Sequence, residues 1–131
     1  MNNFKKEEKL CSKKLIDEIF TKGYSFTCYP FKINYFSREL QNKLPAKVLI
    51  IVSKKRFKNA VTRNLIKRKI RESFRLNKEA FYKMLYNFNY ETNISLIYIG
   101  NELITSNEIE LKLRLALEKI VEYLRKNIFS K

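Results

Sequence analysis

Two apolar stretches, KVLIIVS at residues 47–53 and NISLIYIG at residues 93–100, decide the fold of this 131-residue chain. Each is a continuous apolar run of strand length, which is typical of a strand buried on both faces. The chain between them predicts a helix at about 59–76 and a short extra helix at 78–88. A long helix between two buried strands indicates a crossover connection within one sheet.

The flanking segments add further elements. Residues 13–22 predict an amphipathic helix, and residues 105–128 predict a last helix with a core-facing apolar stripe. Residues 24–37 are rich in aromatic side chains and predict strand structure. Pro30 interrupts that stretch, so we expect two short strands or a bulged edge strand.

The predicted element order is therefore α-β-β-β-α-β-α. It indicates an α+β fold, with helices packed on one sheet as a single-domain α-β sandwich. The length suits one RNA-binding domain over residues 1–131, with residues 1–11 expected to form a flexible basic arm.

The charge of the chain is large and unevenly distributed. Lys and Arg number 28 against 13 Asp and Glu, a net charge of +15. Residues 53–78 hold eleven of the basic residues and one acidic residue, whereas residues 79–131 hold seven of each. Such an excess implies a polyanionic partner, either nucleic acid or an anionic membrane surface.

The composition excludes several classes of chemistry. The chain has no His, which excludes Ser-His and Cys-His nucleophile pairs, and its two Gly are too few for a phosphate-binding loop. Its carboxylates show no pairing suited to catalysis, so we predict no catalytic residue and no metal ligand in the protein. No apolar run has the roughly 20 residues of a membrane span. We expect no membrane partner and a cytoplasmic location.

The helix at 59–76 carries the most informative pattern. At about 100° per residue, one arc of the helix holds a cationic ridge of Asn64, Lys67, Arg68, Arg71 and Arg75. One flank of the ridge holds Ile66, Ile70 and Phe74, and the other holds Val61, Leu65 and Leu76. The stacked cations repel one another, with no acidic side chain expected on that face. Binding of phosphates in place of counterions makes this arrangement favourable.

The stretch SKKRFKNAVTRNLIKRKIRE, residues 53–72, also resembles the signature of the bacterial ribonuclease P protein subunit. The resemblance extends over about residues 8–126. It implies an accessory subunit of a ribonucleoprotein endoribonuclease whose RNA carries the chemistry with Mg²⁺. The complex removes the 5′ leader from precursor tRNA. The resemblance further implies a left-handed crossover around the signature helix, and we expect one protein per ribonuclease P RNA.

The resemblance and the ridge together give the candidate site residues. Those expected to bind RNA are Lys54, Lys55, Arg56, Lys58, Asn59, Arg63, Asn64, Lys67, Arg68, Arg71 and Arg75. The resemblance also implies a leader-binding cleft between the first helix and the sheet, for which the candidates are Phe20, Phe31 and Tyr35. Leu65 stands where the family usually has arginine, and Lys58 where many members have glycine.

Two other readings of the same residues stay open at this stage. A ribosome- or rRNA-associated protein without a processing role would have the same basic helix. A basic DNA-binding module is also compatible with the charge, although the sequence lacks a recognisable helix-turn-helix spacing.

Overall fold

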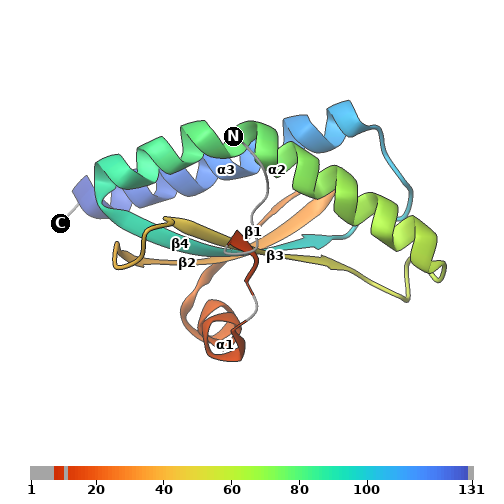
Figure 1. The fold of residues 1–131 in the computed structure, drawn as a ribbon, viewed down its shortest axis with the longest axis horizontal. Helices are drawn as coiled ribbons and strands as arrows, with labels where there is room; N and C mark the ends of the chain where they lie inside the picture. The colour runs from red at the N-terminus through yellow and green to blue at the C-terminus, as the bar shows by residue number, and fades with distance from the viewer. Residues whose placement is uncertain (1–7, 11, 130–131) are drawn as a thin grey trace.

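The computed structural model describes residues 8–10 and 12–129. Within this part of the chain the elements are α1 (Lys13–Lys22), β1 (Tyr24–Cys28), β2 (Phe31–Glu39), β3 (Ala46–Val52), α2 (Ala60–Phe88), β4 (Tyr90–Tyr98) and α3 (Ser106–Phe129). The predicted order and the α+β fold are both confirmed (Figure 1).

The four strands form one sheet in the order β1-β2-β4-β3. β2 pairs antiparallel with both β1 and β4, whereas β3 and β4 run parallel. The connection between the two parallel strands is α2, as the two apolar stretches predict. The left hand of this crossover stays a prediction from the resemblance.

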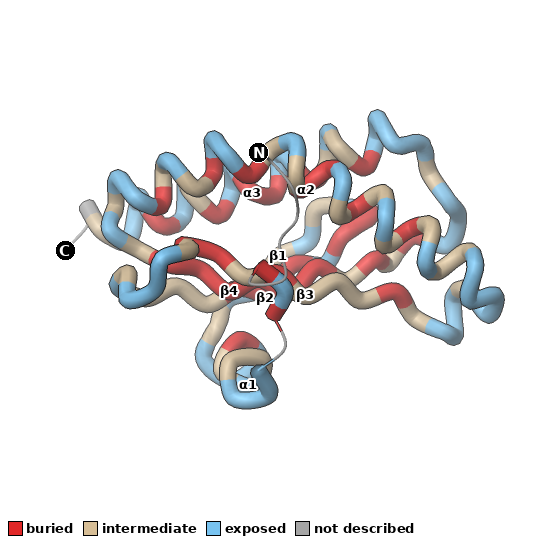
Figure 2. The backbone as a smooth tube through the Cα atoms, viewed as in Figure 1, coloured by how far each residue is buried: buried red, intermediate tan, exposed pale blue. Residues whose placement is uncertain are grey.

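The helices cover the two faces of the sheet unequally. α2 and α3 lie side by side on one face, and α1 lies on the other (Figure 1). The main core fills the space between the sheet and the α2–α3 layer, and its positions recur along both helices and the strands (Figure 2). This arrangement holds the N-terminal half of α2 on a rigid support of strands.

The helix after β3 is longer than predicted. The separate helices expected at 59–76 and 78–88 are one continuous helix, Ala60–Phe88. The prediction was wrong because no Pro or Gly lies near residue 77, and the buried side continues through Phe81 and Leu85. The helix ends at Asn89, whose φ of 59° is left-handed and stops the helical hydrogen bonding.

α1 joins the sheet through a tight turn at Gly23. The backbone N–H of Gly23 donates to the carbonyl of Ile19 at 3.0 Å and closes the helix. A Cβ at Gly23 would overlap the carbonyl oxygens of Ile19 and Tyr35. Glycine is therefore required here, and it allows α1 to lie directly over β2.

Glu91, at the start of β4, fixes the loop between β2 and β3. Its carboxylate accepts hydrogen bonds from the backbone N–H groups of Gln41 (2.7 Å) and Asn42 (3.1 Å) and from Nε of Arg38 (3.0 Å). Burial alone would raise the pKa of Glu91, but these hydrogen bonds outweigh it and hold that pKa below its usual value.

Part of the expected flexible arm is packed against the fold. The backbone N–H of Leu10 donates to the carbonyl of Val48 at 3.0 Å, and Glu8 and Leu10 are buried. At these positions the prediction of a flexible arm was wrong, because Glu8 and Leu10 have partners in α2 and β3 that the local sequence does not reveal. The rest of the predicted arm, residues 1–7 and 11, lies outside the described residues.

Candidate nucleic-acid interface

The loop between β3 and α2 is the first part of the candidate interface. Lys54, Lys55 and Lys58 are exposed there. Asn59 is the N-cap of α2, and its Oδ1 accepts a hydrogen bond from the backbone N–H of Val61 at 2.8 Å. The N-terminal turn of a helix carries partial positive charge, so this end of α2 adds to the attraction for anions.

Two of the arginines predicted to bind RNA also hold this loop in place. Nη1 of Arg63 donates to the carbonyls of Phe57 (2.8 Å) and Lys58 (3.0 Å). Nη1 of Arg56 donates to the carbonyl of Ile99 (2.8 Å) and to Oδ1 of Asn101 (2.7 Å). These contacts fix the loop relative to the end of β4, and they leave Arg56 and Arg63 fewer donors for RNA.

The cationic ridge lies along the outer side of the first half of α2. Asn64 and Arg68 are exposed, and Lys67 and Arg71 are partly buried. On one flank of the ridge, Ile66, Ile70 and Phe74 are fully buried in the core, as the wheel predicts. Packing of this flank fixes the rotation of the helix, and the cations are therefore presented together on one rigid surface.

The other predicted apolar flank of the ridge is not packed against the rest of the fold. Val61 is 75% exposed and Leu76 is 54% exposed, while Leu65 is partly buried. The prediction that both apolar flanks hold the helix on the sheet was wrong, because α2 packs against the sheet and α3 along one side only. The ridge consequently faces solvent over a wider arc than the wheel suggests.

The last member of the ridge is paired with an acidic side chain. Nε of Arg75 donates to Oε2 of Glu72 at 3.0 Å, one turn earlier on α2. The expectation that no acidic group relieves the ridge was therefore wrong at this end. The hydrogen bond from Arg75 lowers the pKa of the Glu72 carboxyl, and burial opposes this shift only in part.

The three leader-cleft candidates do not come together in the structure. Phe20 lies on α1 and is 49% exposed. Phe31 is fully buried on the opposite face of the sheet, with its ring centroid 6.1 Å from that of Tyr98. Tyr35 lies on that same face between the rings of Tyr24 and Phe26, and burial raises its pKa to about 12. Phe31 and Tyr35 are therefore core residues, and only Phe20 stays a candidate.

The alternate positions of β2 face α1 instead. These are Lys32, Asn34 and Phe36, and Asn34 pairs in register with Ser95 of β4. Both Asn34 and Ser95 are buried, and neither Nδ2 of Asn34 nor Oγ of Ser95 has a hydrogen-bond partner among the described residues. Neither Asn34 nor Ser95 was among the predicted leader-cleft residues. Ser95 was missed because the second apolar stretch predicts a uniformly apolar strand.

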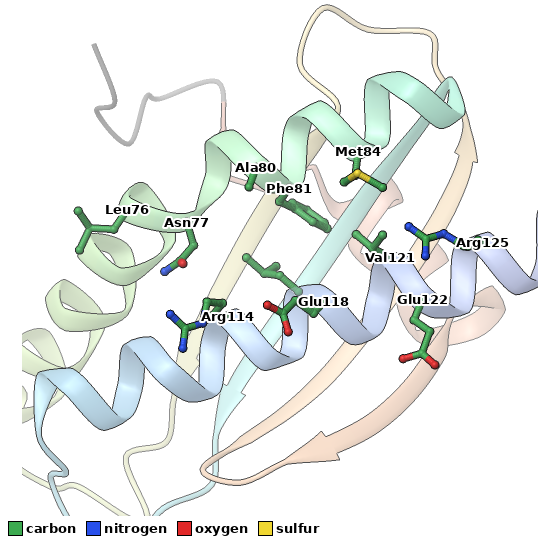
Figure 3. Close-up of a pocket in the computed structure, with 11 residues that line it drawn as sticks. Leu76, Asn77, Ala80, Phe81, Met84, Arg114, Glu118, Val121, Glu122 and Arg125 are labelled. Atoms are coloured by element: carbon green, nitrogen blue, oxygen red, sulfur yellow. The ribbon is translucent and has the colours of Figure 1, made fainter.

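A hollow with a volume of about 600 Å³ lies elsewhere, between α2 and α3 (Figure 3). Phe81 and Leu117 contribute its apolar wall, while Arg114 and Glu118 lie at its rim. No ridge residue lines it, and its first α2 residue is Leu76. The cationic face and the apolar hollow are thus separate features of α2.

Among the described residues, no three His, Cys, Asp or Glu side chains are grouped closely enough to hold a metal ion. None of the helices in the described part of the chain combines the length and apolar character of a membrane span.

Comparison with known proteins assigns the chain to a family. The family model described as Ribonuclease P matches residues 4–120. The chain belongs to the ribonuclease P protein family. A ribonuclease P protein component from Porphyromonas gingivalis is 30% identical over 115 residues, covering 88% of this chain and 84% of that protein. One from Petrotoga mobilis is 40% identical over 85 residues, covering 65% and 68%. The resemblance seen in residues 53–72 is confirmed.

Solved ribonuclease P proteins share the fold. The Staphylococcus aureus protein has a TM-score of 0.66 at 27% identity, covering 86% of this chain and 94% of that one. The Thermotoga maritima protein has a TM-score of 0.67 at 24% identity, covering 86% and 96%. The α+β sandwich of this chain is therefore that of the ribonuclease P proteins.

The two departures from the family signature lie at the margins of the candidate interface. In this ribonuclease P protein Leu65 is partly buried beside the ridge, where an arginine would add a further cation. Lys58 is exposed, and its carbonyl accepts the hydrogen bond from Arg63. Neither departure interrupts the row of Lys67, Arg68 and Arg71.

Proposed function

We propose that this ribonuclease P protein binds the catalytic RNA of the holoenzyme through the loop at residues 54–59 and the ridge on α2. The observation that carries the proposal is the rigid row of Lys67, Arg68 and Arg71, held outward by buried Ile66 and Ile70. Because packing fixes the backbone of α2, the three cations are presented together, and binding of phosphates has to order only their side chains. The guanidinium groups add planar, bidentate hydrogen bonds.

The chain acts as a subunit of an endonuclease, and we assign the chemistry of the reaction to the RNA. In this proposal the protein contributes no catalytic side chain and no metal ligand. Its cations screen RNA phosphates, so that the Mg²⁺ ions used by the RNA bind at lower concentration. The product is the mature 5′ end of tRNA. One protein per RNA and a cytoplasmic location, where precursor tRNA is found, stay predictions.

We further propose that the face of the sheet beneath α1 receives the 5′ leader of precursor tRNA. Phe20 offers a half-exposed ring for stacking, and Lys32 offers an exposed cation on the same side of the sheet. Aromatic rings interleaved with cations suit single-stranded nucleic acid, because every base has a face that can stack. Asn34 and Ser95 add polar groups at the floor of this region.

Reconstitution tests the proposed function against a role on the ribosome. The protein is mixed with the ribonuclease P RNA of the same organism, and cleavage of precursor tRNA is measured across a Mg²⁺ titration. We expect the protein to lower the Mg²⁺ concentration needed for cleavage. A basic protein of similar net charge serves as the control for general charge screening. If the two proteins have the same effect, or neither has any, the processing role is refuted.

A further inference from the structure

The segment Glu8–Leu10 lies along the outer edge of the sheet. β3 is an edge strand, and Lys9 pairs with Val48 in parallel register. On one side of Lys9, the backbone of Leu10 is hydrogen bonded to Val48 at 3.0 Å. On the other side, the carboxylate of Glu8 is bound in the interior. The position of Lys9 is thus fixed from both neighbours.

The attachment of Glu8 is a buried ion pair. Nζ of Lys78 donates to its two carboxylate oxygens at 2.9 and 3.1 Å, and the hydroxyl of Tyr82 also donates to it. The side chains of Lys78 and Glu8 are 7% and 1% exposed. A buried pair gains little over an apolar pair of the same shape, but removing one partner is costly. The pair therefore specifies one docked position of the segment on α2.

Docking brings Lys9 beside the cationic ridge. A hollow of about 170 Å³ lies at the edge of β3, and its cationic lining residues are Lys9, Lys67 and Arg71. The other lining residues are the apolar Leu10, Val48, Leu49 and Ile50. Among the described residues that line the hollow there is no carboxylate, and none of its three cations forms an ion pair with another described residue.

We propose that the docked segment Glu8–Leu10 completes, with Lys67 and Arg71, a binding site for a single phosphate group. This inference rests on the proposed function, in which the phosphate belongs to the backbone of the bound RNA. Three like charges around one small hollow repel each other in the free protein, and an anion held among them relieves that repulsion. The apolar wall formed by β3 excludes part of the water that would otherwise screen the contact.

Replacement of Lys9 tests the site directly. Lys9→Ala is compared with Lys83→Ala, which removes one exposed cation from the C-terminal half of α2, about 18 Å along the helix from Arg71. We expect Lys9→Ala to weaken binding of the ribonuclease P RNA about 5- to 30-fold and to reduce the slope of log K against log salt by about 0.7 to 0.9. Lys83→Ala should leave the slope unchanged.

Equal effects of the two variants would overturn the inference, since Lys9 would then act only through net charge. If the wild-type protein fails to bind the RNA, the proposed function fails instead, so the two failures are distinguishable. Inorganic phosphate separates the two sources of the anion. If titration with inorganic phosphate selectively shifts the NMR signals of Lys9 and Arg71, free phosphate is sufficient for binding. Changes on RNA addition alone would indicate that the RNA backbone is required.

Glu8→Gln gives an independent test, because charge and docking then act in opposite directions. The substitution raises the net charge from +15 to about +16, so general electrostatics predicts tighter RNA binding. Our proposal predicts weaker binding, because the neutral amide no longer holds Lys78 and Lys9 leaves the hollow. A matched control is Glu118→Gln, at an exposed position of α3. This variant should bind RNA at least as tightly as the wild type. Tighter binding by Glu8→Gln would overturn the inference.

Discussion

Phe20 and Phe31 were both candidates for the leader-binding cleft, but alanine substitutions at the two positions should have different main effects. Phe31→Ala should mainly lower the stability of the fold, and Phe20→Ala should mainly weaken binding of precursor tRNA. Phe31 is fully buried, so Phe31→Ala should cost about 3–5 kcal/mol of unfolding free energy. For a chain of this length, that loss corresponds to a melting temperature lower by about 10–18 °C. Phe20 is already half exposed, and Phe20→Ala should cost only about 1–2 kcal/mol.

Binding of precursor tRNA should depend on Phe20, the residue that contributes less to stability. If a leader base stacks on Phe20, Phe20→Ala should remove about 1–3 kcal/mol of stacking, a loss of about 5- to 150-fold in affinity for precursor tRNA. Affinity for mature tRNA, which has no leader, should not change. The assays are thermal unfolding of the free protein and competition binding of the two tRNAs to the reconstituted holoenzyme. Equal losses for precursor and mature tRNA would refute the leader contact. A larger loss of stability in Phe20→Ala than in Phe31→Ala would refute the assignment of the two faces.

Two further predictions concern Glu91 and Glu72. Because the pKa of folded Glu91 lies below the usual 4.5, its ionised form stabilises the fold above that pH, and this contribution is lost as the pH falls through the folded pKa. Unfolding free energy measured by denaturant titration should therefore fall on the acid side, and less steeply in Glu91→Gln; an unchanged profile would contradict the role of its hydrogen bonds to the loop. Glu72→Gln should remove the ion pair of Glu72 with Arg75 and tighten RNA binding more than Glu118→Gln, which adds the same charge on α3. Equal gains for the two variants would indicate that Arg75 does not contact RNA.

The sequence predicts the framework of this fold well. Continuous apolar runs identified the two parallel strands, and the turn at Pro30 separated β1 from β2 as expected. These features are local, because a run of apolar residues or a proline acts over a few positions. The single long α2 could have been predicted from the same kind of local signal. No Pro or Gly marks an end near Asn77, the surrounding residues are mostly good helix formers, and the buried side continues through Phe81 and Leu85.

The arrangement of the candidate interface residues on α2 was predicted in outline, but their local contacts were not. Periodicity alone placed Lys67 and Arg68 on the same side of α2, next to the flank that holds the buried Ile66 and Ile70. It could not show that Arg63 is hydrogen bonded to loop carbonyls, since that contact depends on how the loop folds back.

Other features depend on contacts between distant parts of the chain. Alternation along β2 shows that Phe31 and Asn34 lie on opposite faces, but only the packing of the helices shows which face is the core. The ion pair of Glu8 with Lys78 joins residues 70 positions apart, and neither local sequence indicates it. The N-terminal segment was therefore expected to be flexible.

The salt dependence of RNA binding tests the central claim most directly, namely that the ridge on α2 is the surface that contacts the ribonuclease P RNA. The measurement compares a variant with Lys67, Arg68 and Arg71 all replaced by alanine with a control variant that lacks three other exposed cations, Lys83, Arg114 and Lys126. Both variants lose the same net charge. The ridge variant should lower the slope of log K against log salt by about 2 to 3, whereas the control variant should keep the wild-type slope. Equal slopes for the two variants would contradict the claim.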